Sequence, residues 1–102
     1  MIHVLAIITA KPGMRARILE SFRANAPTVR AEDGCIAYEA VVDVDNPSPG
    51  FASFGPDTFV VVERWASIEA LQAHGIAPHM KAYASAVREL TASRAIHVLQ
   101  PA

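Results

Sequence analysis

The sequence predicts an α+β fold built around a four-stranded antiparallel sheet. Short runs rich in β-branched residues alternate with segments of helical periodicity, in the order strand, helix, strand, strand, helix, strand. With right-handed crossovers, this order most simply builds the ferredoxin-like, or split βαβ, arrangement with the helices on one face. The predicted strands are apolar on both faces, and no further helix is available to cover the second face. We therefore expect that face to pack against a second copy of the chain in a two-fold dimer.

The first predicted strand, residues 2–9, is apolar at both alternating sets of positions, which is typical of an interior strand. In the turn at residues 11–13, Pro12 suits the first position of a helix, because that position needs no backbone N–H donor. Apolar side chains then recur at helical spacing, at Met14, Ile18, Phe22 and Ala26. Pro27 lies within this pattern and predicts a kink, followed by a last turn through Arg30.

Residues 35–44 and 59–65 are the second and third predicted strands. Successive side chains point to opposite faces of a strand, so Ile36 and Tyr38 are expected on one face and Cys35 on the other. In the third strand the same alternation gathers one set on a single face, namely Phe59, Val61, Glu63 and Trp65.

The connection between these strands, residues 45–57, carries three prolines and two glycines and cannot sustain regular structure. Long connections in small domains are usually functional or disordered. Phe51 and Phe54 favour an ordered segment, because two aromatic side chains in a loop tend to pack against a pocket mouth or a partner subunit.

The last third of the chain predicts two helices and a strand. Ser67 is a good N-cap for a short helix through His74, and Gly75 interrupts the helical pattern. Pro78 restarts a helix whose apolar stripe is Met80, Tyr83, Ala84, Val87 and Leu90. Residues 95–99 form the last predicted strand.

The bulk composition limits the classes of partner. The 102 residues form one predicted domain, residues 1–102, and are 52% hydrophobic with a net charge of -1. The chain therefore lacks the basic field that would bind nucleic acid or a membrane surface. The apolar N-terminal run is too short to span a bilayer, and the single cysteine cannot form an intramolecular disulfide. We expect a cytoplasmic protein.

Two segments carry a family resemblance. Residues 62–74 read Val-Glu-Arg-Trp-Ala-Ser-Ile-Glu-Ala-Leu-Gln-Ala-His, and residues 78–83 read Pro-His-Met-Lys-Ala-Tyr. Together with Lys-Pro-Gly at 11–13, Glu-Asp-Gly-Cys at 32–35 and Ile-His-Val-Leu-Gln-Pro at 96–101, they resemble the antibiotic biosynthesis monooxygenase (ABM) domain family. The ordered set covers almost the whole chain.

This resemblance implies a dimeric α+β barrel with a pocket between the sheet and the helices of each subunit. It also implies oxygenation of a small phenol, anthrone or quinol with molecular oxygen and without a metal, haem or flavin cofactor. The long insertion at residues 45–57 departs from the usual pattern, so the resemblance does not define the pocket entrance or the substrate. The first strand has no Asn, which counts against the haem-degrading branch of the family.

His74 and His79 are the candidate catalytic residues. A cofactor-free oxygenase needs a base that makes an electron-rich substrate anionic, and histidine suits this task near neutral pH. The two histidines flank the break at Gly75, where an interrupted helix leaves groups free to face a ligand. The alternative is structural: His74 caps the short helix, and His79 is a partly exposed residue of a first turn.

Trp65, Tyr83 and Tyr38 are the candidate substrate-binding residues. Trp65 could stack on a planar substrate, and the Tyr83 hydroxyl could donate to a substrate oxygen, although core packing explains both side chains as well. The same argument applies less strongly to Tyr38, on the second predicted strand. His3 and His97 are expected to be structural or surface residues. Glu63 and Arg64 are expected to be cross-strand or interface partners.

The sequence contains no zinc-protease, nucleotide-loop or nucleophile-elbow motif. His74 and His79 are five residues apart across a break, which is a poor spacing for metal ligands on a helix. Three functions remain: a cofactor-independent monooxygenase, an isomerase of small hydroxy-ketones that shuttles protons through the same histidines, and a non-catalytic dimeric ligand-binding or stress-response module.

Overall fold

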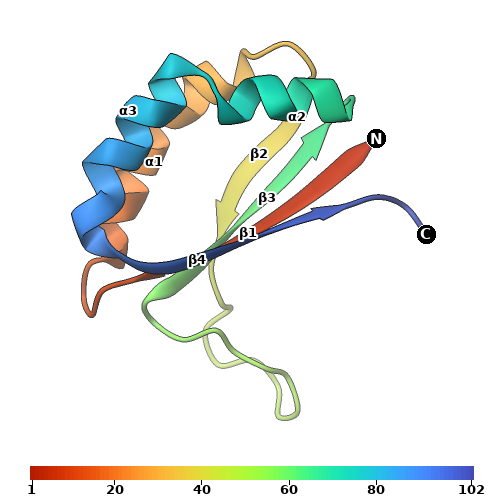
Figure 1. Ribbon diagram of the computed structural model, residues 1–102. Helices are drawn as coiled ribbons and strands as arrows, with labels where there is room; N and C mark the ends of the chain where they lie inside the picture. Colours follow the sequence, from red (N-terminus) through yellow and green to blue (C-terminus); the bar gives the residue numbers. More distant parts are fainter.

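The computed structural model describes residues 1–102 and has the predicted ferredoxin-like architecture, with three α-helices on one face of a four-stranded antiparallel sheet (Figure 1). The strands lie in the order β2-β3-β1-β4. Their bounds and those of the helices, in chain order, are β1 Ile2–Ala10, α1 Arg15–Arg30, β2 Cys35–Val41, β3 Thr58–Trp65, α2 Ile68–Gly75, α3 Pro78–Val87, a 3₁₀ turn Arg88–Leu90 and β4 Thr91–Leu99.

The core lies between the sheet and the helices. Alternation along β1 directs Val4 and Ala6 toward the helices, where both are buried. From α1, the Phe22 ring stacks on Tyr38 of β2 with a centroid distance of 5.0 Å. Trp65, at the end of β3, has no solvent exposure. The apolar stripe predicted for residues 14–26 is therefore the face that α1 buries, and it carries most of the hydrophobic stabilisation of the helix.

Helix α1 begins later than the sequence pattern predicts. Pro12 is not at its first position: Pro12 and Gly13 form a turn, and the first helical residue is Arg15. Gly13 has a φ of +78°, which a right-handed helix cannot include, and its N–H donates to the Asp57 carboxylate over 3.0 Å. At the other end, the helix continues past Pro27 to Arg30 as predicted.

Strand β2 differs from the predicted alternation at its start. The pairing with β3 changes from Cys35 opposite Trp65 to Ala37 opposite Arg64, so Ile36 is an extra residue in the ladder. This irregularity leaves Ile36 47% exposed, and Cys35 packs against the same core as Tyr38. The prediction that Ile36 shares a face with Tyr38 is therefore wrong. The strand also ends at Val41 rather than at residue 44.

Strand β4 is longer than predicted and begins at Thr91. Residues 88–90 form a 3₁₀ turn, and the chain joins the sheet directly after it, at Thr91. The Thr91 hydroxyl donates to the carbonyl of Val87 over 2.9 Å. The helix-facing side of β4 is incompletely covered: Ile96 and Val98 are about half exposed.

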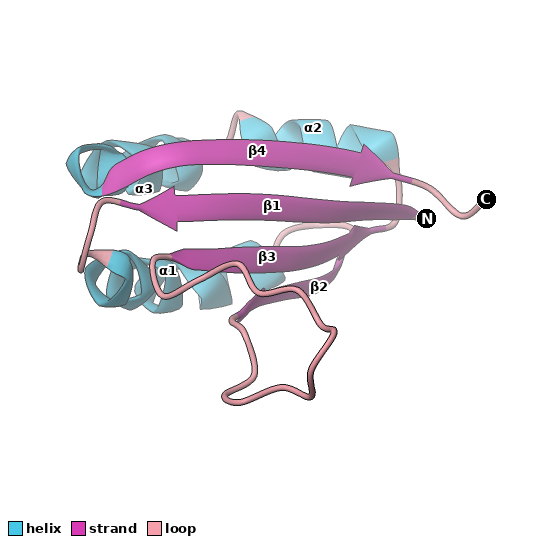
Figure 2. Ribbon diagram, turned by 90° about the horizontal axis from the view of Figure 1, so that it is seen from below, coloured by secondary structure: helices cyan, strands magenta, loops and turns pink.

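The face of the sheet opposite the helices is uncovered, and residues 42–57 form a loop that extends beyond this face (Figures 1 and 2). The Asp43 carboxylate closes the loop by accepting hydrogen bonds from the N–H groups of Phe54 and Gly55, and these bonds lower the Asp43 pKa. None of the helices has the combination of length and apolar character needed to cross a membrane.

Candidate functional site

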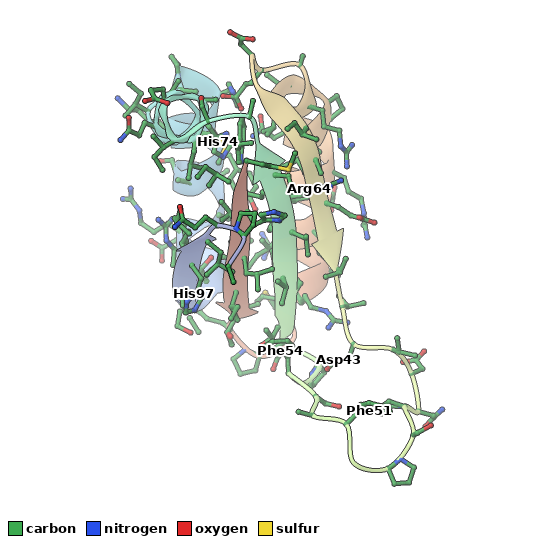
Figure 3. The ribbon with its side chains drawn as sticks, turned by 90° about the vertical axis from the view of Figure 1, so that its right-hand side faces the viewer. Asp43, Phe51, Phe54, Arg64, His74 and His97 are labelled. Carbon is green, nitrogen blue, oxygen red and sulfur yellow. The ribbon has the colours of Figure 1, made fainter.

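A groove of about 410 Å³ lies between α2, α3 and β4. Its apolar walls include Val4, Leu71, Met80 and Ile96, and its polar groups include Glu63 and His74. A small number of convergent polar groups in an apolar cavity is typical of a ligand site. No residue of the loop at 42–57 lines this groove. Figure 3 shows the reason: His74 lies at the α2 end of the strands, and Phe51 lies beyond their opposite end.

His74 is placed by the short helix α2. The Ser67 hydroxyl accepts a hydrogen bond from the N–H of Ala70 over 3.1 Å and caps the helix, as predicted. His74 lies in the last turn, where it is only 6% exposed. Its Nδ1 lies 2.7 Å from Oε2 of Glu32, a residue in the turn before β2. A buried histidine therefore faces the groove with one ring nitrogen already paired to a carboxylate.

The Glu32 carboxylate also lies close to the second predicted histidine. Nε2 of His79, in the first turn of α3, is 3.5 Å from the same Oε2 atom. Nδ1 of His79 lies 3.2 Å from Oδ1 of Asn25 on α1, and the Asn25 amide nitrogen lies 3.4 Å from the sulfur of Met80. His74, Glu32, His79 and Asn25 thus form a continuous polar chain that links α2, the turn before β2, α3 and α1.

Trp65 and Tyr38 pack behind His74. The Trp65 ring centroid is 4.7 Å from that of His74, and the Tyr38 ring meets His74 edge to face at 5.7 Å. The indole N–H of Trp65 donates to Oε1 of Glu63 over 2.9 Å. Trp65 and Tyr38 are buried and do not line the groove, so they contact His74 rather than the open cavity.

The Glu63 carboxyl and the hydroxyls of Tyr38 and Tyr83 are shifted toward their neutral forms. Burial raises the pKa of Glu63, opposed by the hydrogen bond from Trp65 and by the nearby His74. Burial likewise raises the pKa of Tyr83 to about 12 and that of Tyr38 well above its usual range. Both tyrosines therefore keep their hydroxyl protons, as a hydrogen-bond donor to a ligand must.

A second cavity, of about 460 Å³, adjoins the groove and shares Met80, Ala84 and Arg94 with it. Tyr83 lines this second cavity, between α3 and the start of β4. The Tyr83 ring meets Phe22 edge to face at 6.4 Å, which links it to the core below Tyr38. Tyr83 is therefore next to the histidine groove but is not one of its lining residues.

The structure thus brings His74, His79, Trp65 and Tyr38 into one cluster and places Tyr83 in the adjoining cavity. Three further residues of the site, Glu32, Asn25 and Glu63, were not assigned a role there by the sequence. The Glu-Asp-Gly turn at 32–34 was visible as a motif, but nothing in the sequence indicated its contact with α2.

Glu63 differs most from expectation. Its side chain is buried, lines the groove and binds Trp65 of its own strand, so the cross-strand or interface role expected for it is wrong. Arg64, His3 and His97 lie on the other face of the sheet, as the register of β1 with β3 and β4 requires. Two histidines share one carboxylate at the site, and no group of three or more His, Cys, Asp or Glu residues is arranged to hold a metal ion.

The fold and the site together define a class of protein: a small ferredoxin-like domain with a buried histidine–carboxylate pair beside an apolar groove. The family model described as antibiotic biosynthesis monooxygenase matches residues 1–86. The chain belongs to this antibiotic biosynthesis monooxygenase (ABM) family.

Comparison with individual proteins agrees with this assignment. The chain is 41% identical over 103 aligned residues to the probable quinol monooxygenase YgiN of Escherichia coli K12, covering 99% of this chain and 98% of YgiN. Among solved structures, Rv0793 from Mycobacterium tuberculosis is 29% identical with a TM-score of 0.80, over 99% of this chain and 94% of that one. PA3566 from Pseudomonas aeruginosa is 25% identical with a TM-score of 0.82, over 99% and 93% of the two chains.

Proposed function

We propose that this chain is a monooxygenase that oxidises a small quinol or related electron-rich aromatic compound with molecular oxygen, without a metal or flavin. The observation that carries the proposal is the buried His74 at the wall of an apolar groove, with its Nδ1 2.7 Å from the Glu32 carboxylate. A relative that is 41% identical bears the name of a quinol monooxygenase, which favours this substrate class.

In this proposal His74 removes the hydroxyl proton of the substrate. The resulting anion gives an electron to molecular oxygen, and the substrate radical and superoxide combine to a peroxide. Loss of water from this peroxide, with the proton returned by His74, leaves one oxygen atom on the product. Between these two steps the proton is held by His74, whose Nδ1 is paired with the Glu32 carboxylate and whose ring lies 4.7 Å from that of Trp65. General base catalysis of this kind contributes about 10²- to 10⁴-fold to a rate.

The other candidate residues have supporting roles in the same proposal. His79 is the second proton-transfer residue, because it reaches the same Glu32 oxygen and its side chain is more exposed, 25% against 8% for His74. Trp65 and Tyr38 fix the orientation of the His74 ring that they contact. Tyr83 donates its hydroxyl to substrate that extends into the adjoining cavity.

We also propose that the chain acts as a homodimer that pairs its uncovered sheet faces. Large apolar side chains on this face are partly exposed: Leu5, Val41 and Leu99 have exposed fractions of 37%, 38% and 44%. Burial of such side chains against a second copy would supply the hydrophobic stabilisation that the isolated sheet face lacks.

A second candidate function is supported by Glu63. Glu63 and His74 line the same groove, and two proton-transfer groups on one cavity suit an isomerase that moves a proton beside the carbonyl of a small hydroxy-ketone. This reaction needs no oxygen, so oxygen consumption separates it from the first proposal.

Oxygen uptake by the purified, metal-stripped protein tests the proposal, with a panel of hydroquinones and anthrones as substrates. We expect uptake by the wild type, with kcat lowered by about 10²- to 10⁴-fold in His74→Ala and lowered to a smaller extent in His79→Ala. Gln72→Ala is the control, because Gln72 is an exposed residue of α2 that lies neither in the groove nor on the uncovered sheet face, and its variant should keep full activity.

Uptake that survives His74→Ala would show that His74 is not the base. No uptake by the folded wild type with any member of the panel would reject the monooxygenase proposal. Exchange of solvent deuterium next to the carbonyl of a hydroxy-ketone would then identify the isomerase, and the absence of both reactions would favour a ligand-binding module.

A further inference from the structure

We propose that Glu32 is a positioning residue that fixes the tautomer of His74 and thereby leaves Nε2 as the ring nitrogen available to a substrate. The catalytic consequence rests on the proposed function, whereas the tautomer itself is a property of the protein alone.

The tautomer follows from hydrogen-bonding capacity. An ionised carboxylate has acceptor sites only, so the contact of 2.7 Å between Glu32 Oε2 and His74 Nδ1 requires the proton to lie on Nδ1. A neutral imidazole carries one ring proton. With that proton on Nδ1, Nε2 keeps its lone pair and is the atom that can accept a proton from a ligand in the groove.

The Glu32 carboxylate is itself held in place by α3 and α1. His79 Nε2 lies 3.5 Å from the same Oε2 atom, an ion-pair distance. Nδ1 of His79 lies 3.2 Å from Oδ1 of Asn25, and the His79 ring donates to both oxygens when it carries two protons. His74 and His79 thus approach one carboxylate oxygen from different helices, which restricts where that oxygen can be.

The backbone around Glu32 is equally constrained. Its N–H donates to the carbonyl of Val29 over 2.9 Å, and its carbonyl accepts from the N–H of Cys35 over 3.1 Å. Two residues later in the turn, the carbonyl of Gly34 accepts from the N–H of Ala66 over 2.8 Å. A Cβ atom on Gly34 would lie only 2.6 Å from Cβ of Ala70, so the turn packs directly against α2. Glu32 and His74 are therefore fixed relative to each other by backbone as well as side-chain contacts.

The tautomer can be read without any substrate. The ¹⁵N chemical shifts of the two ring nitrogens distinguish the protonated from the unprotonated atom, and the signals of His74 are assigned by their loss in His74→Gln. In the wild type we expect His74 to be protonated at Nδ1. In Glu32→Gln we expect a mixture of tautomers, because an amide can either accept from or donate to Nδ1.

Asp33→Asn is the matched control. Asp33 is an exposed carboxylate in the same turn and has no contact with either histidine, so its replacement removes the same charge and should leave the His74 tautomer unchanged. Glu32→Asp keeps the carboxylate but shortens its reach, and we expect an intermediate population. Circular dichroism of each variant establishes that it is folded.

Oxygen uptake provides the catalytic readout. We expect Glu32→Gln to lower kcat with little change in KM, and by less than His74→Ala does, because part of the population keeps the proton on Nδ1 and Nε2 free. Glu32→Asp should restore part of the activity, which a purely structural role would not predict.

Two results would overturn the inference. One is a wild-type His74 protonated at Nε2, or a tautomer that Glu32→Gln leaves unchanged. The other is an active enzyme whose kcat is unaffected when the tautomer changes. If the folded wild type consumes no oxygen, the proposed function fails, and the nitrogen shifts still decide whether Glu32 sets the tautomer.

Discussion

Glu63 has almost no contact with solvent, and this burial makes its ionisation one source of pH-dependent stability. Its pKa is raised by burial, so the native state holds the Glu63 proton more tightly than the unfolded state does. Where the native state binds more protons, the free energy of unfolding falls as pH rises. The contribution of Glu63 is therefore fully present below its ordinary pKa of about 4.5 and is lost as pH rises through the raised value.

We expect Glu63→Gln to remove this loss of unfolding free energy at higher pH. The Gln side-chain oxygen can still accept the hydrogen bond from Trp65, and the variant carries no charge to bury. Urea unfolding over a pH series should show the stability of the variant relative to wild type rising with pH above about 4.5 and levelling off once Glu63 of the wild type is ionised. Glu20→Gln, at an exposed position of α1, is the control, and a constant difference between Glu63→Gln and wild type would contradict the assignment.

The candidate site was predictable from the sequence to the extent that its chemistry depends on residue type. His74 and His79 stand out because histidine is the side chain that changes charge near neutral pH, and Trp65 because it ends a buried strand. Glu32 could not be found this way: it lies 42 residues before His74, and their contact exists only because α2 packs on the turn before β2. The role of Glu63 was predicted wrongly because the alternation of side chains along a strand indicates which face of the sheet a residue occupies, but not its hydrogen-bond partner.

At the scale of the secondary-structure elements, the turn between α1 and β2 determines whether the site forms. Gly34 has a φ of +82°, and a Cβ atom there would lie 2.6 Å from Cβ of Ala70 on α2. Gly34→Ala therefore adds a clash to the backbone strain of about 1–3 kcal/mol that a non-glycine residue incurs in this conformation. We expect a loss of stability larger than this strain alone, measured by urea unfolding.

Gly13→Ala separates the two effects. Gly13 has a similar φ of +78°, and nothing lies within 4 Å of the position of its Cβ. Its variant should lose stability through backbone strain only. Equal losses in the two variants would show that Gly34 does not pack tightly against α2, and the placement of Glu32 next to His74 would lose its main support.

The order and type of the elements were predictable because hydrophobic periodicity depends only on local sequence. The errors lie where tertiary contacts decide. The hydrogen bond between Gly13 and Asp57 accompanies the later start of α1, and the irregularity at Ile36 reverses the predicted faces of Cys35 and Ile36. Similarly, β4 begins at Thr91 because β1 offers a partner strand for residues 91–94, which have little strand character of their own.

At the scale of the whole molecule, the helices leave one broad apolar face uncovered. Figure 2 views the sheet from this side, with no helix in front of the strands and the loop at 42–57 extending beside β2 and β3. The loop carries Phe51 and Phe54, which are 72% and 57% exposed. Because the loop does not line the groove of His74, a partner subunit rather than a pocket mouth is the contact that we expect for these rings.

Leu5→Asp tests the proposed dimer. Leu5 lies in β1, opposite Val62 of β3 and His97 of β4, at the centre of the uncovered face, and it is 37% exposed. A carboxylate there is hydrated in a monomer and loses contact with water in a dimer, with only the neighbouring His97 to pair with, which costs about 2 kcal/mol, or roughly 30-fold in Kd. Sedimentation equilibrium should show dissociation of the variant at concentrations where the wild type is dimeric, with an unchanged circular dichroism spectrum.

Ile76→Asp provides the comparison, since Ile76 is 72% exposed at the end of α2 on the helix side, and its variant should remain a dimer. Dissociation by both variants, or by neither, would contradict pairing through the sheet.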